Sequence, residues 1–320
     1  MAIGARGALF GFSSYQLAEG LAHLQLTMSL CVPLAGWVIV RYANGRLTGK
    51  RFATRIAAIA VAQFLISPEL LATMLLIGAI TAAGAIALAP HARTEVRGTL
   101  IWSLTGVAVA GLLLSPMLLT MVRHAPAHLN ASVGYSADLA NLIVPTRVTA
   151  VGGAWGSSVA NHFPGNLAEQ GPYLGLPLLV IVASFASSRR SGPGARLLLF
   201  VLLSSIVLSL GPRLTVGGRP TAWLPAALLG HLPALADALP VRFALYTSLV
   251  ISIIVAVWLA GARRQRALSW VLADSPSCPS PLRQRERCGG GRRPARSPAA
   301  SSIACYQRTA MFYRFPSGIR

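Results

Sequence analysis

Long apolar stretches recur along the 320-residue chain and constrain its fold more than any other feature. A membrane-spanning helix needs ~20 mostly apolar residues, because each adds ~1.5 Å toward the ~30 Å of hydrocarbon. The stretches predict about seven spans, near residues 21–40, 54–67, 70–89, 98–122, 172–187, 197–211 and 242–261. We therefore expect an all-α fold, a polytopic transmembrane helix bundle formed by residues 1–262.

The composition agrees with a bundle that faces lipid. Charged residues make up 11% of the chain and hydrophobic residues 54%, whereas a soluble domain carries about 25% charged residues. The net charge of +20 belongs to the whole chain and does not form one basic patch. Before residue 262, the basic residues lie mainly in short segments between apolar stretches. That distribution is typical of membrane orientation and predicts no nucleic-acid partner.

The second and third spans are separated by a short polar break. Read as one helix, residues 54–89 would be ~54 Å long, far more than a bilayer requires. Ser67, Pro68 and Glu69 stand between the two halves. Serine is a favoured N-cap, proline suits the first helical turn, and glutamate favours the positive end of the helix dipole. We expect the chain to reverse at Ser67 and a new helix to begin there.

Basic residues predict the orientation. With seven spans, the basic segments 41–55, 90–97 and 188–196 and the residues after 262 share one side, which the positive-inside rule makes cytoplasmic. With six spans, segment 188–196 would lie outside. We therefore expect a multi-pass protein of a bacterial plasma membrane, with its N-terminus outside, its C-terminus in the cytoplasm, and residues 123–171 external.

The last part of the chain has a different composition. Residues 263–320 contain 12 basic and two acidic residues and no apolar periodicity. Such a composition predicts a disordered cytoplasmic tail, rich in Arg, Pro, Ser and Cys. From about Asp274 onward two explanations stay open: a native basic tail that touches anionic lipid, or the product of a shifted reading frame.

Several carboxylates fall at the predicted outer side, where they could serve a transferase as general bases or metal ligands. They are Glu19, Glu69, Asp138, Glu169 and Asp237. The alternative is that they are merely solvated, because acidic residues are depleted within the bilayer and collect in loops. We take Glu69, Asp138 and Glu169 as the candidate catalytic residues. Glu69 stands out because ionisable groups near membrane depth are costly and often functional.

Three arginines also fall on this side, against the positive-inside trend: Arg213, Arg219 and Arg242. The planar guanidinium suits phosphate oxygens, so Arg213 and Arg242 are candidates for holding a lipid phosphate. Two alternatives remain open, namely contacts with ordinary lipid headgroups and, for Arg242, an ion pair with Asp237.

The sequence assigns no metal site. His124 and His128 have the spacing of two ligands on one helix face, but Pro126 between them argues against a regular helix. The cofactor is therefore unknown, and a divalent metal remains open. The chain has no Walker motif and no GxSxG nucleophile elbow.

Five stretches resemble actinobacterial membrane proteins related to GT-C-type glycosyltransferases. They are GFSSYQLAEGLAHLQL (11–26), AQFLISPELLAT (62–73), EQGPYLGLPLL (169–179), LSLGPRLTVGG (208–218) and ALPVRFALY (238–246). The resemblance runs from about Phe10 to Ala260. It implies sugar transfer from a polyprenyl-phosphate donor on the outer face of the membrane, with membrane lipid as a partner. The family's usual acid in the first external loop has no counterpart, so the resemblance also implies N-terminal truncation and supplies no catalytic base.

Two other functions stay open. A transporter or flippase-type protein would also contain broken helices, and Pro33, Pro68 and Pro116 lie at membrane depth. No paired inverted repeat is visible in the sequence to support transport. The second possibility is an inactive fragment of a transferase. Neither the sugar nor the acceptor follows from the sequence.

Overall fold

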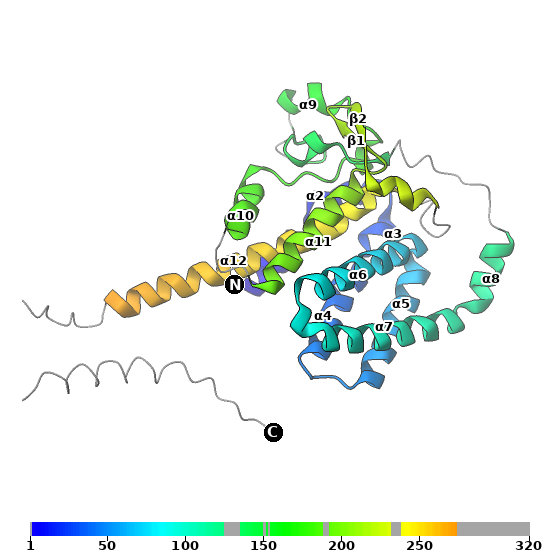
Figure 1. Ribbon diagram of the computed structural model, residues 1–320. Coiled ribbons are helices and arrows are strands. Elements are labelled where there is room, and N and C mark those ends of the chain that lie inside the picture. The colour runs from blue at the N-terminus through cyan, green and yellow to red at the C-terminus, as the bar shows by residue number, and fades with distance from the viewer. Residues whose placement is uncertain are drawn as a thin grey trace, which may run out of the picture. The chain divides into compact units, whose positions relative to one another are not determined.

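The computed structural model describes residues 2–124, 135–149, 152, 154–187, 192–231 and 238–273 (Figure 1). Most of these residues are helical. The longer helices are α4 (Cys31–Ala43), α5 (Gly49–Ile66), α6 (Pro68–Leu88), α7 (Arg93–Leu113), α10 (Leu176–Ser187), α11 (Pro193–Ser209) and α12 (Ala244–Ala273). Shorter helical elements are α1 (Ala2–Gly11), α2 (Ser14–Glu19), α3 (Leu24–Thr27), α8 (Ser115–Arg123), α9 (Ala154–Ala160), η1 (Pro90–Ala92), η3 (Leu139–Leu142), η4 (Leu167–Glu169), η5 (Pro225–His231) and η6 (Pro240–Phe243).

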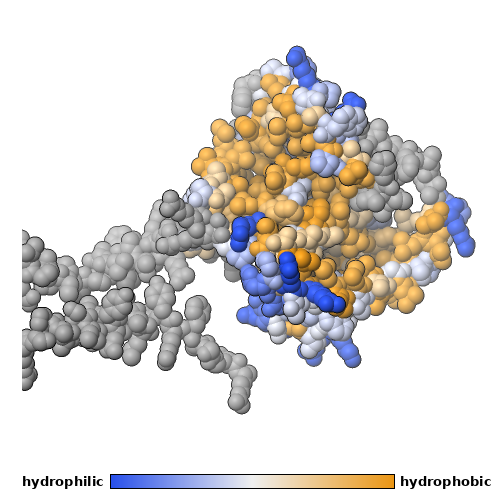
Figure 2. Space-filling view, in the orientation of Figure 1, coloured by the Kyte–Doolittle hydropathy of each residue, from blue (hydrophilic) through white to orange (hydrophobic). Residues whose placement is uncertain are grey.

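Four helical segments of the described chain are long and apolar enough to cross a membrane. They are Leu24–Ala43, Pro68–Leu88, Pro90–Leu113 and Pro240–Gly261. Helices α10 and α11 are apolar but shorter, and α5 carries three basic residues in its first seven. The described chain is thus mostly helical with four candidate membrane-spanning segments, which fits the predicted membrane protein at this coarser level. Figure 2 shows the expected surface, a broad apolar face with hydrophilic residues toward its margins.

The break between the second and third predicted spans is confirmed. Helix α5 ends at Ile66, and the Ser67 side chain accepts a hydrogen bond from the amide of Leu70. Pro68 occupies the first turn of α6 and Glu69 follows it. The N-cap, the proline and the acidic first turn thus act as the sequence predicted.

One predicted span differs from the helix that forms. Residues 98–122 were predicted as one span, but α7 begins at Arg93 and ends at Leu113, and α8 begins at Ser115 with Pro116 in its first turn. Proline lacks an amide proton and is best tolerated at a helix start, so Pro116 begins a new helix. The first span is also displaced, because Leu24–Ala43 replaces residues 21–40.

Helix α12 is the central helix of the bundle. Of the membrane-length segments, Pro240–Gly261 is 67% buried, whereas the other three are 11–28% buried. Its Leu245 and Ile254 are fully buried in a core that also contains Tyr15, Leu70 and Leu202. The Ser205 hydroxyl of α11 lies 3.0 Å from that of Thr247 on α12, and the two helices run alongside each other in Figure 1.

Small residues allow α5 and α7 to approach closely. A Cβ atom at Gly106 of α7 would lie 2.7 Å from the carbonyl oxygen of Ala53 on α5. Ala57, Ala60 and Ala110 form a small buried cluster beside this contact. Close backbone approach at small residues is a common way for helices to associate in lipid, where apolar burial drives little association.

The described chain is mostly helical, as predicted, and one β-hairpin accompanies the helices. Strands β1 (Arg213–Val216) and β2 (Arg219–Trp223) form an antiparallel hairpin with a register irregularity between Leu214 and Thr215. Gly217 and Gly218 have positive φ at the turn, as the tight hairpin requires. The contacts divide the chain into Met1–Gln265 and Arg266–Arg320.

Helix α12 extends into the first residues of the predicted tail, because its backbone is helical to Ala273. The Ala- and Leu-containing sequence there is compatible with a helix despite its arginines. The predicted tail of residues 263–320 otherwise stays a prediction. The predicted disorder from residue 274 onward concerns residues outside those that the structure describes.

Candidate functional site

Four charged side chains from distant parts of the chain meet at one end of the bundle. Glu19 ends α2, Glu69 lies in the first turn of α6, Glu169 ends η4, and Arg242 lies in η6 just before α12. Arg242 bonds to Glu19 through Nη1, its Nε lies 3.5 Å from Glu69 Oε1, and its Nη2 lies 4.0 Å from Glu169 Oε1. We call these four residues the charged cluster.

Helix α2 positions Glu19. Its N-cap is Ser13, whose side chain accepts a hydrogen bond from the amide of Gln16. The Ser14 hydroxyl lies 2.6 Å from the carbonyl oxygen of Gly171 and 2.5 Å from that of Tyr173, so it donates to the segment that follows η4. A Cβ atom at Gly171 would lie 2.9 Å from the Cα of Tyr15, so glycine allows this close contact.

A capping box positions Glu169. The Asn166 side chain accepts from the amide of Ala168, and Glu169 Oε2 accepts from the amide of Asn166 at 3.0 Å. The other carboxylate oxygen, Oε1, is left to face Arg242 and lies 3.9 Å from Nε2 of His23. One carboxylate thus caps a short helix and belongs to the charged cluster at the same time.

Glu69 connects α6 to the start of α12. Its Oε1 accepts a hydrogen bond of 3.0 Å from the amide of Leu239, three residues before Arg242. Its side chain is 28% exposed, whereas those of Glu19, Glu169 and Arg242 are at most 3% exposed. Glu69 is therefore the only carboxylate of the charged cluster that reaches the surface of the described structure.

The charged cluster is unbalanced in charge. Three carboxylates surround one guanidinium, so full ionisation would leave two negative charges at a mostly buried site. Within the described structure, the partly exposed His23 is the one other basic side chain within 4 Å of a cluster carboxylate. Uncompensated buried charge is expensive, and a buried carboxyl usually binds a proton instead. Burial, opposed by Arg242 and reinforced by Glu169 and Glu69, raises the pKa of Glu19 to about 7.

Tyr15 completes the buried surroundings. It is one turn before Glu19 on α2 and is fully buried, and its hydroxyl has no hydrogen-bond partner among the described residues. Burial, and then the nearby Glu19 carboxylate, raise the pKa of Tyr15 well above its ordinary value. The second carboxylate oxygen of Glu19 is likewise buried without a partner in the described structure. The Tyr15 hydroxyl can therefore donate a hydrogen bond, and the second oxygen of Glu19 can accept one or bind a proton.

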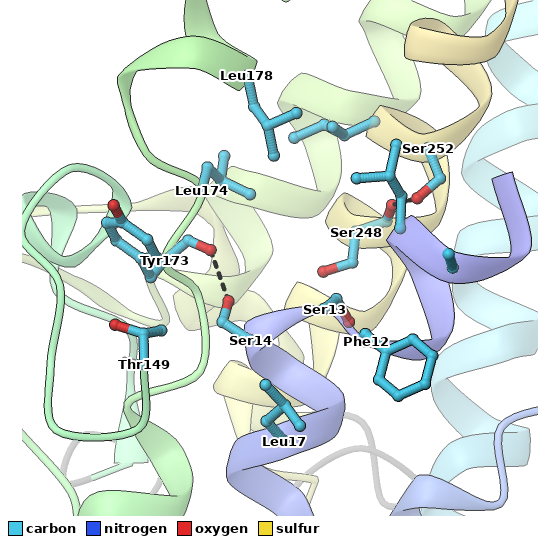
Figure 3. Close-up of a pocket in the computed structure, with 13 residues that line it drawn as sticks. Phe12, Ser13, Ser14, Leu17, Thr149, Tyr173, Leu174, Leu178, Ser248 and Ser252 are labelled. Carbon is cyan, nitrogen blue, oxygen red and sulfur yellow. Dashed lines mark hydrogen bonds between the residues drawn. The ribbon is translucent and has the colours of Figure 1, made fainter. Parts of the chain in front are cut away.

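The other face of α2 lines an apolar groove of about 550 Å³ (Figure 3). Its walls combine aliphatic and aromatic side chains with hydroxyls and contain no charged residue. They include Phe12, Leu17, Leu174, Leu178, Ser248 and Ser252. A volume of this size is typical of a small-molecule or lipid site. Tyr15 and Glu19 point to the charged cluster while Ser14 and Leu17 line the groove, so α2 separates the two.

The structure brings together three of the residues predicted from the sequence, Glu69, Glu169 and Arg242. Asp138 serves elsewhere. It is buried, and its carboxylate accepts hydrogen bonds from the amides of Ala140, Gly217 and Gly218 at 2.7–2.9 Å. These bonds tie η3 to the turn of the β-hairpin, which gives Asp138 a structural role.

Arg213, the other predicted phosphate ligand, is exposed on β1. Its guanidinium lies 4.2 Å from the centre of the Trp223 ring, a cation–π contact. Asp237, the alternative partner of Arg242, lies outside the described residues, as does His128. His124 is exposed, and its ring contacts the carbonyl of Thr120. Among the described residues, no group of three His, Cys, Asp or Glu side chains is arranged to hold a metal ion.

Glu19 was not singled out from the sequence as a catalytic candidate, although it is the most deeply buried carboxylate of the charged cluster. The available signal was local: Tyr15 and Glu19 are one helical turn apart, directly before an apolar stretch. Four separate stretches of the sequence supply the charged cluster: Glu19 in 11–26, Glu69 in 62–73, Glu169 in 169–179 and Arg242 in 238–246.

Comparisons with protein-family models, curated protein sequences and solved structures find no match to this chain.

Proposed function

We propose that this chain is a membrane-embedded glycosyltransferase of the GT-C type, which takes a sugar from a polyprenyl-phosphate donor. The observation that carries the proposal is Glu69, the half-exposed carboxylate of an otherwise buried charged cluster. Support also comes from the four stretches of family resemblance that meet there. The apolar groove beside α2 offers a surface for the hydrocarbon of a lipid donor.

In this proposal Glu69 is the general base. It takes the proton from an acceptor hydroxyl as that oxygen bonds to the anomeric carbon of the sugar, and the bond from that carbon to the lipid phosphate breaks. The phosphate leaves on the lipid with the bonding electron pair. Arg242 and Glu19 are positioning residues, because they hold Glu69 through the guanidinium and are themselves buried.

The finer topology belongs to the same proposal. Helices α5, α10 and α11 would join the four membrane-length segments to give seven crossings. The basic segment 41–55 would be cytoplasmic, and the charged cluster would lie near the outer face of a bacterial plasma membrane. The role of Arg242 as a lipid-phosphate ligand stays a prediction, whereas Arg213 is stacked on Trp223 in the β-hairpin. At Arg242, a phosphate would have to compete with the carboxylates already around the guanidinium.

The test is a transfer assay on the purified chain in lipid nanodiscs, supplied with sugar donors radiolabelled in the polyprenyl chain and with a mixture of simple glycosides as acceptors. The measured quantity is release of polyprenyl phosphate. Glu69→Gln should lower the rate about 100-fold or more, because general bases contribute ~10²–10⁴-fold. Glu95→Gln is the matched control, since Glu95 is an exposed glutamate in the first turn of α7. Equal rates for Glu69→Gln and the unsubstituted chain would refute the role of Glu69.

A lipid transporter or flippase is the second candidate. Buried ionisable side chains at helix ends of a membrane bundle are also typical of transport pathways, and the charged cluster is one. The same preparation in sealed vesicles distinguishes the two. Movement of labelled lipid between leaflets without release of polyprenyl phosphate would favour transport and contradict the transferase.

A further inference from the structure

The β-hairpin carries an exposed apolar surface. All five residues of β2 are exposed, and Trp223 is 68% exposed. Val216 on β1 is 40% exposed, and Leu228 in the following η5 is 69% exposed. A large indole and two aliphatic side chains are thus exposed within one short segment, residues 216–228, and such exposed apolar side chains mark a surface that contacts something other than water.

The charge on this surface has one sign. Arg213 and Arg219 are exposed at the two strands, and residues 212–231 contain no Asp or Glu. The Arg213 guanidinium is stacked 4.2 Å from the centre of the Trp223 ring, so positive charge and indole are presented side by side. The surface is therefore complementary to a layer that is anionic at its exterior and apolar just beneath.

The hairpin is held firmly in this arrangement. Asp138 accepts hydrogen bonds from both turn amides, Gly217 and Gly218, and the amide of Leu224 donates to the carbonyl of Pro212 at the open end. The Thr221 hydroxyl also lies 3.0 Å from the carbonyl oxygen of Leu214. A restrained hairpin loses little conformational freedom when it binds, which favours contact with a surface.

The hairpin also follows directly after the C-terminal end of an apolar helix. Helix α11 ends at Ser209, four residues before Arg213, and Figure 1 shows the hairpin beyond that end of α11. Tryptophan and arginine are characteristic residues of the boundary between hydrocarbon and headgroups, where the indole sits at headgroup level. The helix and the hairpin thus follow one another as a hydrocarbon segment and an interfacial segment.

We propose that the hairpin is an interfacial anchor that docks onto the phospholipid headgroup layer. Arg213 and Arg219 contact headgroup phosphates, while Trp223, Val216 and Leu228 enter the upper acyl region. The partner is the bulk anionic lipid surface, which assigns Arg213 to ordinary lipid and not to a carrier phosphate. This inference does not depend on transferase activity.

The test places a fluorescent probe on the full-length chain. The four cysteines are replaced by serine, and Ala222→Cys, on exposed β2, carries the dye. Leu104→Cys, 65% exposed in the segment Pro90–Leu113, is the hydrocarbon reference, and unattached dye is the water reference. Quenching by nitroxides on the lipid headgroup or on the acyl chain is measured in nanodiscs of phosphatidylcholine, with and without phosphatidylglycerol.

The anchor predicts that headgroup nitroxides quench the Ala222→Cys dye more than acyl-chain nitroxides do, with the reverse order for Leu104→Cys. Phosphatidylglycerol should strengthen the quenching, and Arg213→Gln combined with Arg219→Gln should abolish that lipid dependence. Added inorganic phosphate should leave quenching unchanged, which distinguishes a lipid surface from a phosphate site. If the dye on Ala222→Cys is quenched no more than unattached dye in both lipids, the proposal is overturned, and the surface would instead contact a protein partner.

Discussion

At Glu19, burial and charge pairing oppose each other. Removal from water favours the neutral acid, whereas the bond to Arg242 favours the carboxylate, and burial has the larger effect. The nearby carboxylates of Glu169 and Glu69 also favour the neutral form. A proton at Glu19 therefore reduces the charge imbalance of the charged cluster near neutral pH.

This proton makes stability depend on pH. The pKa of Glu19 in the folded chain is about 7, above the ordinary value of 4.5, so the folded state binds the proton more tightly than the unfolded state. Stability from this group is fully present below pH 4.5 and is lost as the pH rises through 7. Raising the pH from about 6 to about 8 should lower the free energy of unfolding by about 1 kcal/mol.

The measurement is thermal unfolding of the purified chain at the two pH values, beside Glu19→Gln. Glutamine cannot titrate, so the variant should lose most of the pH dependence in this range. Glu95→Gln, which changes an exposed carboxyl, should retain it. A Glu19→Gln chain with the same pH dependence as the unsubstituted chain would place the titrating group elsewhere.

At the scale of elements, α5 and α7 meet where glycine leaves no room for a side chain. Gly106→Ala would place a Cβ 2.7 Å from the carbonyl oxygen of Ala53, so one helix must shift. We expect a loss of about 1–3 kcal/mol in the free energy of unfolding, as for other overpacked sites. Thermal unfolding of the variant in nanodiscs measures it.

The same helix provides the control. A Cβ at Gly111 of α7 would meet no atom within 4 Å, so Gly111→Ala should be neutral or slightly stabilising through the better helix propensity of alanine. Equal effects of the two substitutions would show that the close contact between α5 and α7 contributes little to stability.

Local sequence signals predicted some helix boundaries and missed others. Ser67, Pro68 and Glu69 combine a cap, a proline and an acid, and the break formed where they predicted it. Around Pro116, the sequence is apolar on both sides except for Ser115. The apolar pattern therefore ran on through Pro116, and the boundary between α7 and α8 could not be recognised from it.

For the whole molecule, the proposed orientation rests on the basic segments and can be tested directly. In a chain without other cysteines, Lys50→Cys lies in the predicted cytoplasmic segment and Thr221→Cys lies on the exposed strand β2. We expect a membrane-impermeant thiol reagent to label Thr221→Cys but not Lys50→Cys in intact cells. Labelling of Lys50→Cys alone would reverse the proposed topology.

The membrane class and most helices were predictable because apolar length and caps are local properties of the sequence. The charged cluster was not, because its pairs join residues that are far apart, such as Glu19 with Arg242 and Glu69 with Leu239. Sequence proximity instead made Asp237 the natural partner of Arg242. The role of Asp138 was hidden for the same reason, since it bonds to a turn about 80 residues later.

Glu19 and Arg242, 223 residues apart, share one buried site. A double-mutant cycle measures their coupling, with the free energy of unfolding determined in nanodiscs for Glu19→Gln, Arg242→Gln and the double variant. Arg242→Gln alone should cost about 3–5 kcal/mol, because it leaves buried carboxylates unpaired. The double variant should be about 1–3 kcal/mol more stable than the sum of the single effects predicts. Additive effects of the two substitutions would contradict the shared site.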